Sequence, residues 1–321
     1  MFRRLLLPAL FLVACTSLYA DVTMRMSFDL KTNMTVPGAV PQLSFKEILT
    51  RIKGDRSYSK AGTFVTVTDN SRSEVTLIDT ETQRYAIITM ADYLAKLHGV
   101  SGQNSENLPE AAKQMMANIK FDIQSQETGR TNRIQGIDVY EREVVVNMSI
   151  PVPMPGQENG MQVSMKFQTW KPKASEFERV PALKELATYS DRNQGFNNPA
   201  TMLRQLVSAM PGMGENADKM MAEVTKGGSV ALGMRIGFFM PGLAKMMEQA
   251  QAQAKAKGDA VPAAPALPAD DKPIAEVDFD LTELSTGPLE DGIFVIPAGY
   301  KEAPAEDLVK GMLAAITGIK Q

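Results

Sequence analysis

The chain has 321 residues, and its 34 Lys and Arg residues against 37 Asp and Glu residues give a formal net charge of -3. This balance argues against a dedicated nucleic-acid binder, which normally carries a basic domain or stripe. With one cysteine (Cys15) and one histidine (His98) in the whole chain, intramolecular disulfides and zinc sites of the usual Cys and His type are excluded. No nucleophile stands beside a base in the sequence, so we expect neither an enzyme nor a bound metal or cofactor.

Residues 1–20 have the organisation of a secretory signal peptide. Arg3 and Arg4 precede the apolar run Leu5–Ala14, and small or polar residues follow up to Ala20. The run is too short to cross a bilayer as a helix, which takes about 20 apolar residues. We therefore expect an exported protein of the periplasm, with membrane association only through a lipid anchor.

Two cleavage sites compete in this segment. Leu12–Cys15 resembles a bacterial lipobox, and cleavage there would remove residues 1–14 and leave Cys15 for lipidation. Leu18–Ala20 resembles an ordinary signal-peptidase site and would give a mature chain that begins at Asp21. The first site predicts a lipoprotein anchored to the outer membrane, the second an unanchored protein, and the sequence leaves both open.

The mature chain begins with strand patterns. Val22–Leu30 alternates apolar and polar residues with a period of two, which predicts a strand with one face against a core. Phe64–Thr68 and Glu74–Asp79 flank a turn-forming stretch and predict a hairpin. In that hairpin the apolar residues expected to match are Val65 and Val67 with Val75 and Leu77.

A helix is expected at Pro109–Asn118, followed by strands on either side of a turn at Thr128–Arg130. The clearest hairpin joins Tyr140–Ile150 to a second strand that begins at Met161. Its matched apolar positions are Val144, Val146, Met148 and Ile150 on the first strand and Met161, Val163, Met165 and Phe167 on the second. Short connections between such strands favour an antiparallel sheet.

The remainder of the chain is more helical. Residues 199–257 predict a Met-rich helical insertion, although Val230–Phe238 within it returns to strand alternation. Residues 258–272 are rich in Ala and Pro and predict a flexible linker. A strand is expected at Gly292–Ile296, and residues 301–321 are expected to form a C-terminal helix. We therefore expect one domain over residues 21–300 with this helix appended.

Five short motifs in this order support a family resemblance: Ile52–Arg56, Val75–Tyr85, Ile134–Ile137, Phe167–Trp170 and Phe294–Tyr300. Together they resemble the LolA/LolB-like lipoprotein-carrier superfamily, and most of all a branch of exported bacterial proteins. The resemblance implies an α+β fold in which an open antiparallel half-barrel wraps over helices. It also implies that the concave apolar face accepts acyl chains or a hydrophobic peptide.

The 21 methionines suit such a surface, because unbranched, polarizable side chains repack around variable partners. We expect a hydrophobic groove lined by strand residues, namely Met24, Met26, Phe28, Met148, Val163, Met165, Phe167, Leu232, Met234 and Ile236. We expect a lid that carries Met210, Met213, Met220 and Met221. For any one of these residues, a place in the protein's own core is the competing interpretation.

Two functions remain open from the sequence. The first is a periplasmic or outer-membrane-associated binding protein that shelters lipid or lipoprotein acyl chains. The second is an envelope protein-interaction or stress-sensor module of the same fold, which binds a partner protein and no lipid. Neither involves nucleic acid, and they differ in whether acyl lipid accompanies the purified protein.

Overall fold

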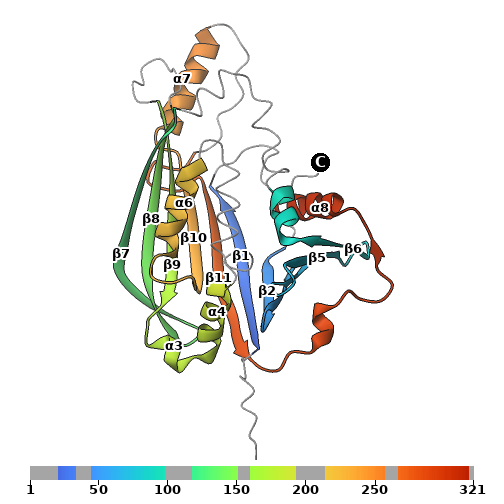
Figure 1. Ribbon diagram of the computed structural model, residues 1–321. Helices are drawn as coiled ribbons and strands as arrows, with labels where there is room; N and C mark the ends of the chain where they lie inside the picture. Colours follow the sequence, from blue (N-terminus) through green and yellow to red (C-terminus); the bar gives the residue numbers. More distant parts are fainter. Residues whose placement is uncertain are drawn as a thin grey trace, which may run out of the picture.

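A single large sheet dominates the computed structural model, which describes residues 21–33, 45–97, 118–150, 160–192, 214–256 and 267–317. Its twelve strands follow the order β12-β6-β5-β4-β3-β2-β1-β11-β10-β9-β8-β7 (Figure 1). The strands are β1 (Val22–Thr32), β2 (Glu47–Lys53), β3 (Arg56–Ala61), β4 (Phe64–Asp69), β5 (Glu74–Asp79), β6 (Arg84–Thr89), β7 (Lys120–Ile134), β8 (Ile137–Ile150), β9 (Met161–Pro172), β10 (Gly233–Phe239), β11 (Ala275–Thr286) and β12 (Lys301–Glu302). Neighbouring strands pair antiparallel, apart from the short parallel pair of β12 and β6. The predicted α+β class with an open antiparallel sheet is confirmed.

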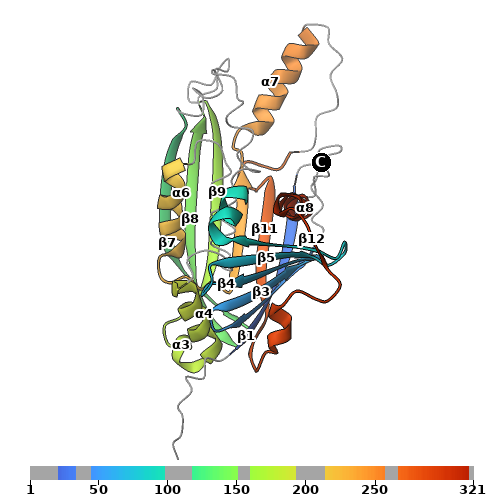
Figure 2. The ribbon, with the colours of Figure 1, turned by 45° about the vertical axis from the view of Figure 1, so that its right-hand side comes forward.

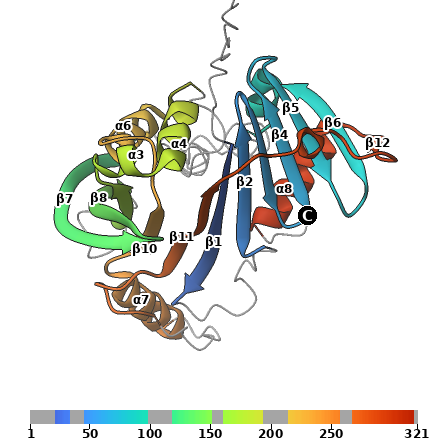
Figure 3. The ribbon, with the colours of Figure 1, turned by 90° about the horizontal axis from the view of Figure 1, so that it is seen from below.

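Helices pack on this sheet in two separate groups. They are α3 (Glu176–Arg179), α4 (Pro181–Arg192), α6 (Gly214–Thr225), α7 (Leu243–Ala256), α8 (Ala305–Thr317), a helix at 90–97 and the short 3₁₀ helix η1 (Asp291–Phe294). Helix α4 lies against β1 and β11, and α6 lies against β7 and β8. Helix α8 lies against β5 and β6, on the other half of the sheet (Figure 2). Seen from below, the sheet curves, and α4 and α6 lie inside the curve (Figure 3). Of the segment 301–321, predicted to be a helix, Ala305–Thr317 is helical, whereas Lys301–Glu302 forms β12.

The strand periodicity gives the sheet two distinct faces. On β1, Val22, Met24 and Met26 are buried, whereas the residues between them are more exposed. Directly opposed residues of antiparallel strands point to the same face. The pairing register therefore shows which residues of each strand from β7 to β6 share a face with Val22. We call this face the inner face.

The inner face holds two apolar cores. The larger core joins β1 and β7–β11 to α4 and α6, and we call this part the α6 half. The smaller core joins β5 and β6 to α8 and the helix at 90–97, and we call the region β3–β6 the α8 half. The α8 half is also covered on its outer face, where Phe294 of η1 packs with Val65 and Val67.

The long β8–β9 hairpin has the predicted register, because Val144, Val146 and Met148 lie opposite Phe167, Met165 and Val163. The turn predicted at Thr128–Arg130 is wrong. Strand β7 continues through this stretch with a register shift between Glu127 and Thr131. The turn lies at Gln135-Gly136, where both residues have positive φ (50° and 76°), as a two-residue hairpin turn requires.

Two strand predictions need correction. Val65 and Val67 lie on the outer face, and Val75 and Leu77 lie on the inner face, because Thr68 is the direct partner of Val75. The strand expected at Gly292–Ile296 is instead helical over Asp291–Phe294.

Residues 199–257 are not simply a helical insertion, because β10 within them pairs with both β9 and β11. The alternation at Val230–Phe238 correctly predicts a strand in this segment, and that strand, β10, lies in the interior of the sheet.

Several predicted features lie outside the described residues. They are the signal peptide 1–20 with Cys15, His98, most of the helix at Pro109–Asn118, Met210 and Met213, and residues 257–266 of the linker region. Within the part that the structure does describe, every helix is too short or too polar to cross a membrane.

Candidate functional site

The residues predicted to line a groove share the inner face of the α6 half. Eight of them lie in its core with at most 7% exposure, namely Met24, Met26, Met148, Met165, Phe167, Leu232, Met234 and Ile236. Phe28 and Val163 are partly buried against the same core. The sequence therefore identified one continuous apolar surface, which six strands build together.

This surface is covered rather than open. Leu183 and Leu186 of α4 and Met220 and Val224 of α6 are buried in the same core. Where α4 and α6 lie, the groove predicted beneath a helical lid is filled by the protein's own side chains, because these two amphipathic helices bury their apolar sides on the sheet. Two of the predicted lid residues lie on α6. Met220 is fully buried between this helix and the sheet, and Met221 is partly buried against the same core.

The apolar inner face reaches further along the strands than its fully buried part. Phe121 and Val163 flank the buried Met148 in one row across β7, β8 and β9. Phe121, Val163, Phe238, Val277 and Phe28 are all only partly buried. They lie toward the end of the sheet where β1 and β8 finish and where β9 and β11 begin. This end combines an apolar lining with partial exposure.

A buried arginine ties α6 to the sheet. The guanidinium of Arg142 on β8 donates to the Glu223 backbone oxygen (3.2 Å), to Glu223 Oε2 (3.1 Å) and to Ser125 Oγ (3.0 Å). Ser125 also donates to the Glu223 carboxylate. This hydrogen bond, with Lys226 and Arg142 nearby, holds the pKa of Glu223 below its ordinary value. The contacts fix the last turns of α6 above β7 and β8.

A buried lysine and a tyrosine complete this anchor. Lys171 is 2% exposed, and its Nζ donates to the backbone oxygens of Lys226 (2.8 Å) and Gly228 (2.7 Å). Tyr140 Oη donates to the Gly227 oxygen (3.3 Å). Cations suit the C-terminal end of a helix, where carbonyl groups lack intrahelical partners. Burial, with a smaller contribution from Arg142, lowers the pKa of Lys171 to about 8.

We call Arg142, Lys171 and Tyr140 the α6 anchor. The sequence analysis missed it, although a signal was present. Arg142 and Tyr140 are two and four positions from Val144 on β8, so they point to the same face as Val144. Lys171 is four positions from Phe167 on β9 and shares that face as well. The period-two pattern therefore places all three inward, where a polar side chain needs a partner. Only the packing of α6 supplies that partner.

The outer face of the α6 half is polar and charged. Asp278 is buried between Lys31 Nζ (2.5 Å) and Arg235 Nε (2.7 Å). Burial by itself raises the pKa of Asp278, but the hydrogen bonds from Lys31 and Arg235 outweigh it and hold the pKa below its ordinary value. An apolar ligand therefore has the inner face, and not this one, as its complementary surface.

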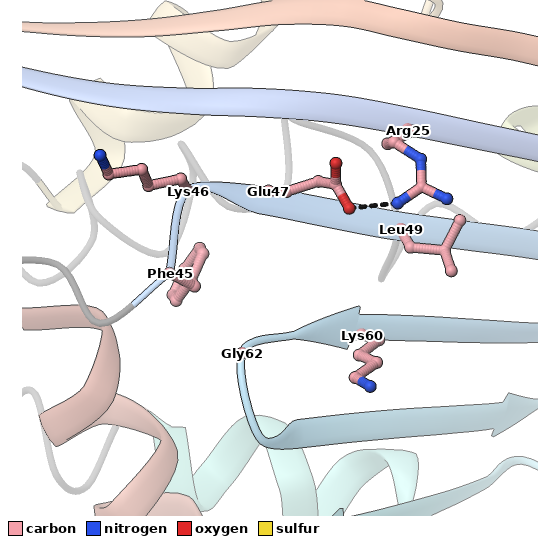
Figure 4. A pocket seen from close by; sticks show the side chains of 7 residues that line it. All are labelled: Arg25, Phe45, Lys46, Glu47, Leu49, Lys60 and Gly62. Atoms are coloured by element: carbon pink, nitrogen blue, oxygen red, sulfur yellow. Dashed lines mark hydrogen bonds and ion pairs between the residues drawn. The ribbon is translucent and has the colours of Figure 1, made fainter.

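A pocket of about 360 Å³ opens near the start of β2 (Figure 4). It is lined by Arg25, Phe45, Lys46, Glu47, Leu49, Lys60 and Gly62. Arg25 is already paired with Glu47 and with Glu283 (3.1 Å). Lys46 and Lys60 extend in different directions (Figure 4), so the pocket does not gather its cations around one point.

Acidic, cysteine and histidine side chains do not gather into a group of three or more able to hold a metal ion anywhere in the described residues. The groups with shifted pKa values at the α6 anchor are engaged with one another or with backbone oxygens. Their arrangement fastens a helix to a sheet.

Comparison with known proteins gives no family. No family model matches the chain, and no curated protein matches it. Among solved structures, one described as PNGF-II in the C2 space group is similar at 8% sequence identity with a TM-score of 0.31. The match covers 91% of this chain and 33% of that chain, so this chain spans about a third of its length. A similarity this low carries no argument about fold or function.

Proposed function

We propose that this chain is a binding protein for a ligand with a long apolar chain, such as an acyl lipid, held on the inner face of the α6 half. The observation that carries the proposal is the apolar lining at the end of this face, where Phe121, Val163 and Phe238 are only partly buried. An apolar ligand placed there would continue the buried surface beneath α6.

The energetics suit an acyl chain. Burial of each CH₂ group contributes about 0.8 kcal/mol, so ten buried groups supply about 8 kcal/mol, which corresponds to roughly micromolar affinity before the costs of association. The methionines of the inner face, such as Met148 and Met165, can adjust to a chain of variable shape. No polar contact is needed for affinity of this order.

Helix α6 is the element whose movement would extend the site. It contributes Met220 and Val224 to the core. Its described hydrogen bonds to the sheet are made by Glu223 and by residues that follow it. A helix held at its C-terminal end can turn about that end while its other turns lift. Ligand would then replace Met220 on the inner face, and the cost of lifting would reduce the apparent affinity.

Binding of a fluorescent fatty acid to the full chain tests this proposal. Val163→Asp places a carboxylate on the partly exposed apolar lining, and we expect it to weaken binding at least tenfold. The matched control is Gln162→Asp, one residue away on the opposite face, where Ser149 Oγ (2.9 Å) can still donate to a carboxylate. Equal affinity of the two variants would contradict the proposed site.

Lipid extraction from the protein purified from its native envelope tests the class of ligand. Acyl lipid that accompanies the protein is the expected result. A stoichiometric protein partner without lipid would favour the alternative interaction module instead.

We also propose that the protein is exported. The mass of the mature chain tests this: a start at Asp21 excludes an anchor, and a start at Cys15 with added lipid supports one.

A further inference from the structure

Strand β7 forms a long open edge of the sheet. It is the last strand in the sheet order, and β8 is its one pairing partner among the described residues (Figure 1). Strand β7 has 15 residues, whereas β12 at the other end of the sheet has two. The backbone N–H and C=O groups along a long edge are a template for another strand. An additional strand can therefore pair with the free edge of β7.

The first half of β7 lacks the features that usually prevent such pairing. From Lys120 to Glu127 its ladder with β8 is regular, and the register shift comes only after Glu127. This stretch contains no proline. Its inner-facing apolar residues, Phe121 and Ile123, are only partly buried at the margin of the larger core, as is Ile119 just before the strand. A partner strand would cover the sides of these residues.

The sequence around Phe121 is complementary to itself in an antiparallel pair. With a twofold axis at Phe121, Lys120 of each copy lies opposite Asp122 of the other copy. Both side chains are exposed on the outer face, so two ion pairs can form across the edge. On the inner face Phe121 meets its own copy, and Ile119 lies opposite Ile123. Charge and apolar character therefore match in the same register.

Neighbouring registers match less well. An axis at Asp122 would oppose two aspartates, which repel each other. An axis at Ile123 would place Lys120 opposite Gln126 and form no ion pair. The axis at Phe121 is therefore the one that the side chains favour.

The axis at Phe121 also keeps the two α6 helices apart. Helix α6 is held to β7 where Ser125 donates to the Glu223 carboxylate. Ser125 is four residues from Phe121, which is about 14 Å along a strand. Because the paired strands run in opposite directions, the two helices lie on opposite sides of the axis.

We propose that two copies of this chain form a twofold dimer by antiparallel pairing of their β7 edges, centred on Phe121. The partner is a second copy because the edge is complementary to itself, and a twofold interface uses the same surface of both subunits. A strand added at the edge lies beside the inner face and not over it. The dimer is therefore independent of the proposed binding of an acyl ligand.

Sedimentation equilibrium of the full chain and of two charge variants tests the dimer and its register. Lys120→Asp opposes two pairs of aspartates, and Asp122→Lys opposes two pairs of lysines, so we expect each variant to dimerise at least tenfold more weakly. An equimolar mixture of the two variants should dimerise again, because every opposed pair then has opposite charges. Low ionic strength suits the measurement, since salt screens exposed charges.

The matched control is Lys60→Asp, which makes the same change of charge at an exposed position of β3 and should leave dimerisation unchanged. Recovery of the dimer on mixing also shows that both variants are folded. A chain that stays monomeric at about 100 µM would overturn the proposal and leave the edge to a strand of another protein. A dimer that persists in both single variants, or variants that do not associate on mixing, would overturn the pairing at Phe121.

Discussion

The two halves of the sheet bury their apolar faces in different ways. In the α8 half, α8 and the helix at 90–97 cover the inner face of β5 and β6, and η1 with its flanking residues covers the outer face of β3–β6. The α6 half is covered on its inner face only, and its outer face carries ion pairs such as Lys31 with Asp278. A strand region packed on both sides resists deformation, whereas one packed on a single side can release its cover. Within the described residues, we therefore expect a covering helix to separate from the sheet in the α6 half.

The largest expected effect comes from the covering helix of the α8 half. Leu308→Ala removes a side chain that is 1% exposed in the smaller core, and we expect it to lower the free energy of unfolding by about 2–5 kcal/mol. Because this half is packed on both faces, the loss should appear as global destabilisation in urea unfolding. Ligand affinity should not change. Rapid amide exchange confined to α8, at unchanged global stability, would show instead that α8 separates from the sheet on its own.

Met220→Ala makes the equivalent change in α6, where the side chain is fully buried. The packing loss is again about 2–5 kcal/mol. If α6 is the removable cover, most of that loss should appear as faster hydrogen exchange of the α6 amides, and global stability should fall less than in Leu308→Ala. Easier lifting should also raise the affinity for an acyl ligand. A global loss equal to that of Leu308→Ala would show that the two covers behave alike.

The stability of the α6 half should depend on pH through Lys171. Burial lowers the pKa of Lys171 from its ordinary 10.5 to about 8, a difference that corresponds to about 3 kcal/mol. Below pH 8 both the folded and the unfolded chain hold this proton, so the cost of burying the charge is fully present. Between pH 8 and 10.5 the folded chain releases the proton first, and the stability contribution of Lys171 therefore rises with pH.

Urea unfolding of the original chain and of Lys171→Met between pH 7 and 9.5 measures this contribution. The original chain should gain stability relative to the variant as the pH rises above 8. Parallel pH profiles of the two proteins would mean that Lys171 titrates at its ordinary value and is not held in a desolvated site.

Arg142→Met is expected to have the smallest effect of the four changes. It removes the hydrogen bonds to Glu223 and Ser125, at a cost of about 1–3 kcal/mol, and should speed exchange at the C-terminal end of α6. The control is Arg133→Met, whose side chain is 68% exposed and lies 3.7 Å from Asp138, and it should cost at most about 0.5 kcal/mol. Equal effects of the two variants would mean that the α6 anchor adds nothing to the packing of Met220.

Alternation within a strand was the most informative signal in the sequence. It placed β1 and fixed the pairing of β8 with β9 to the residue, because in both cases one face is strongly apolar over many residues. It failed where apolar residues occupy both faces of short strands. Val65 and Val75 each face a core, but the cores lie on opposite sides of the sheet, so their matching was predicted wrongly.

Local periodicity in the sequence was enough to predict the α+β class, most of the strands and the residues of the inner face. It could not predict that α4 and α6 bury most of these residues, because helix packing depends on contacts between distant segments. Only the tertiary structure decided why Arg142 and Lys171 tolerate inward positions: the carbonyl groups that pair with them belong to α6 and the residues just after it, more than fifty positions along the chain. The same holds for Ser57 and Thr68, which only the strand register places opposite each other between the two cores.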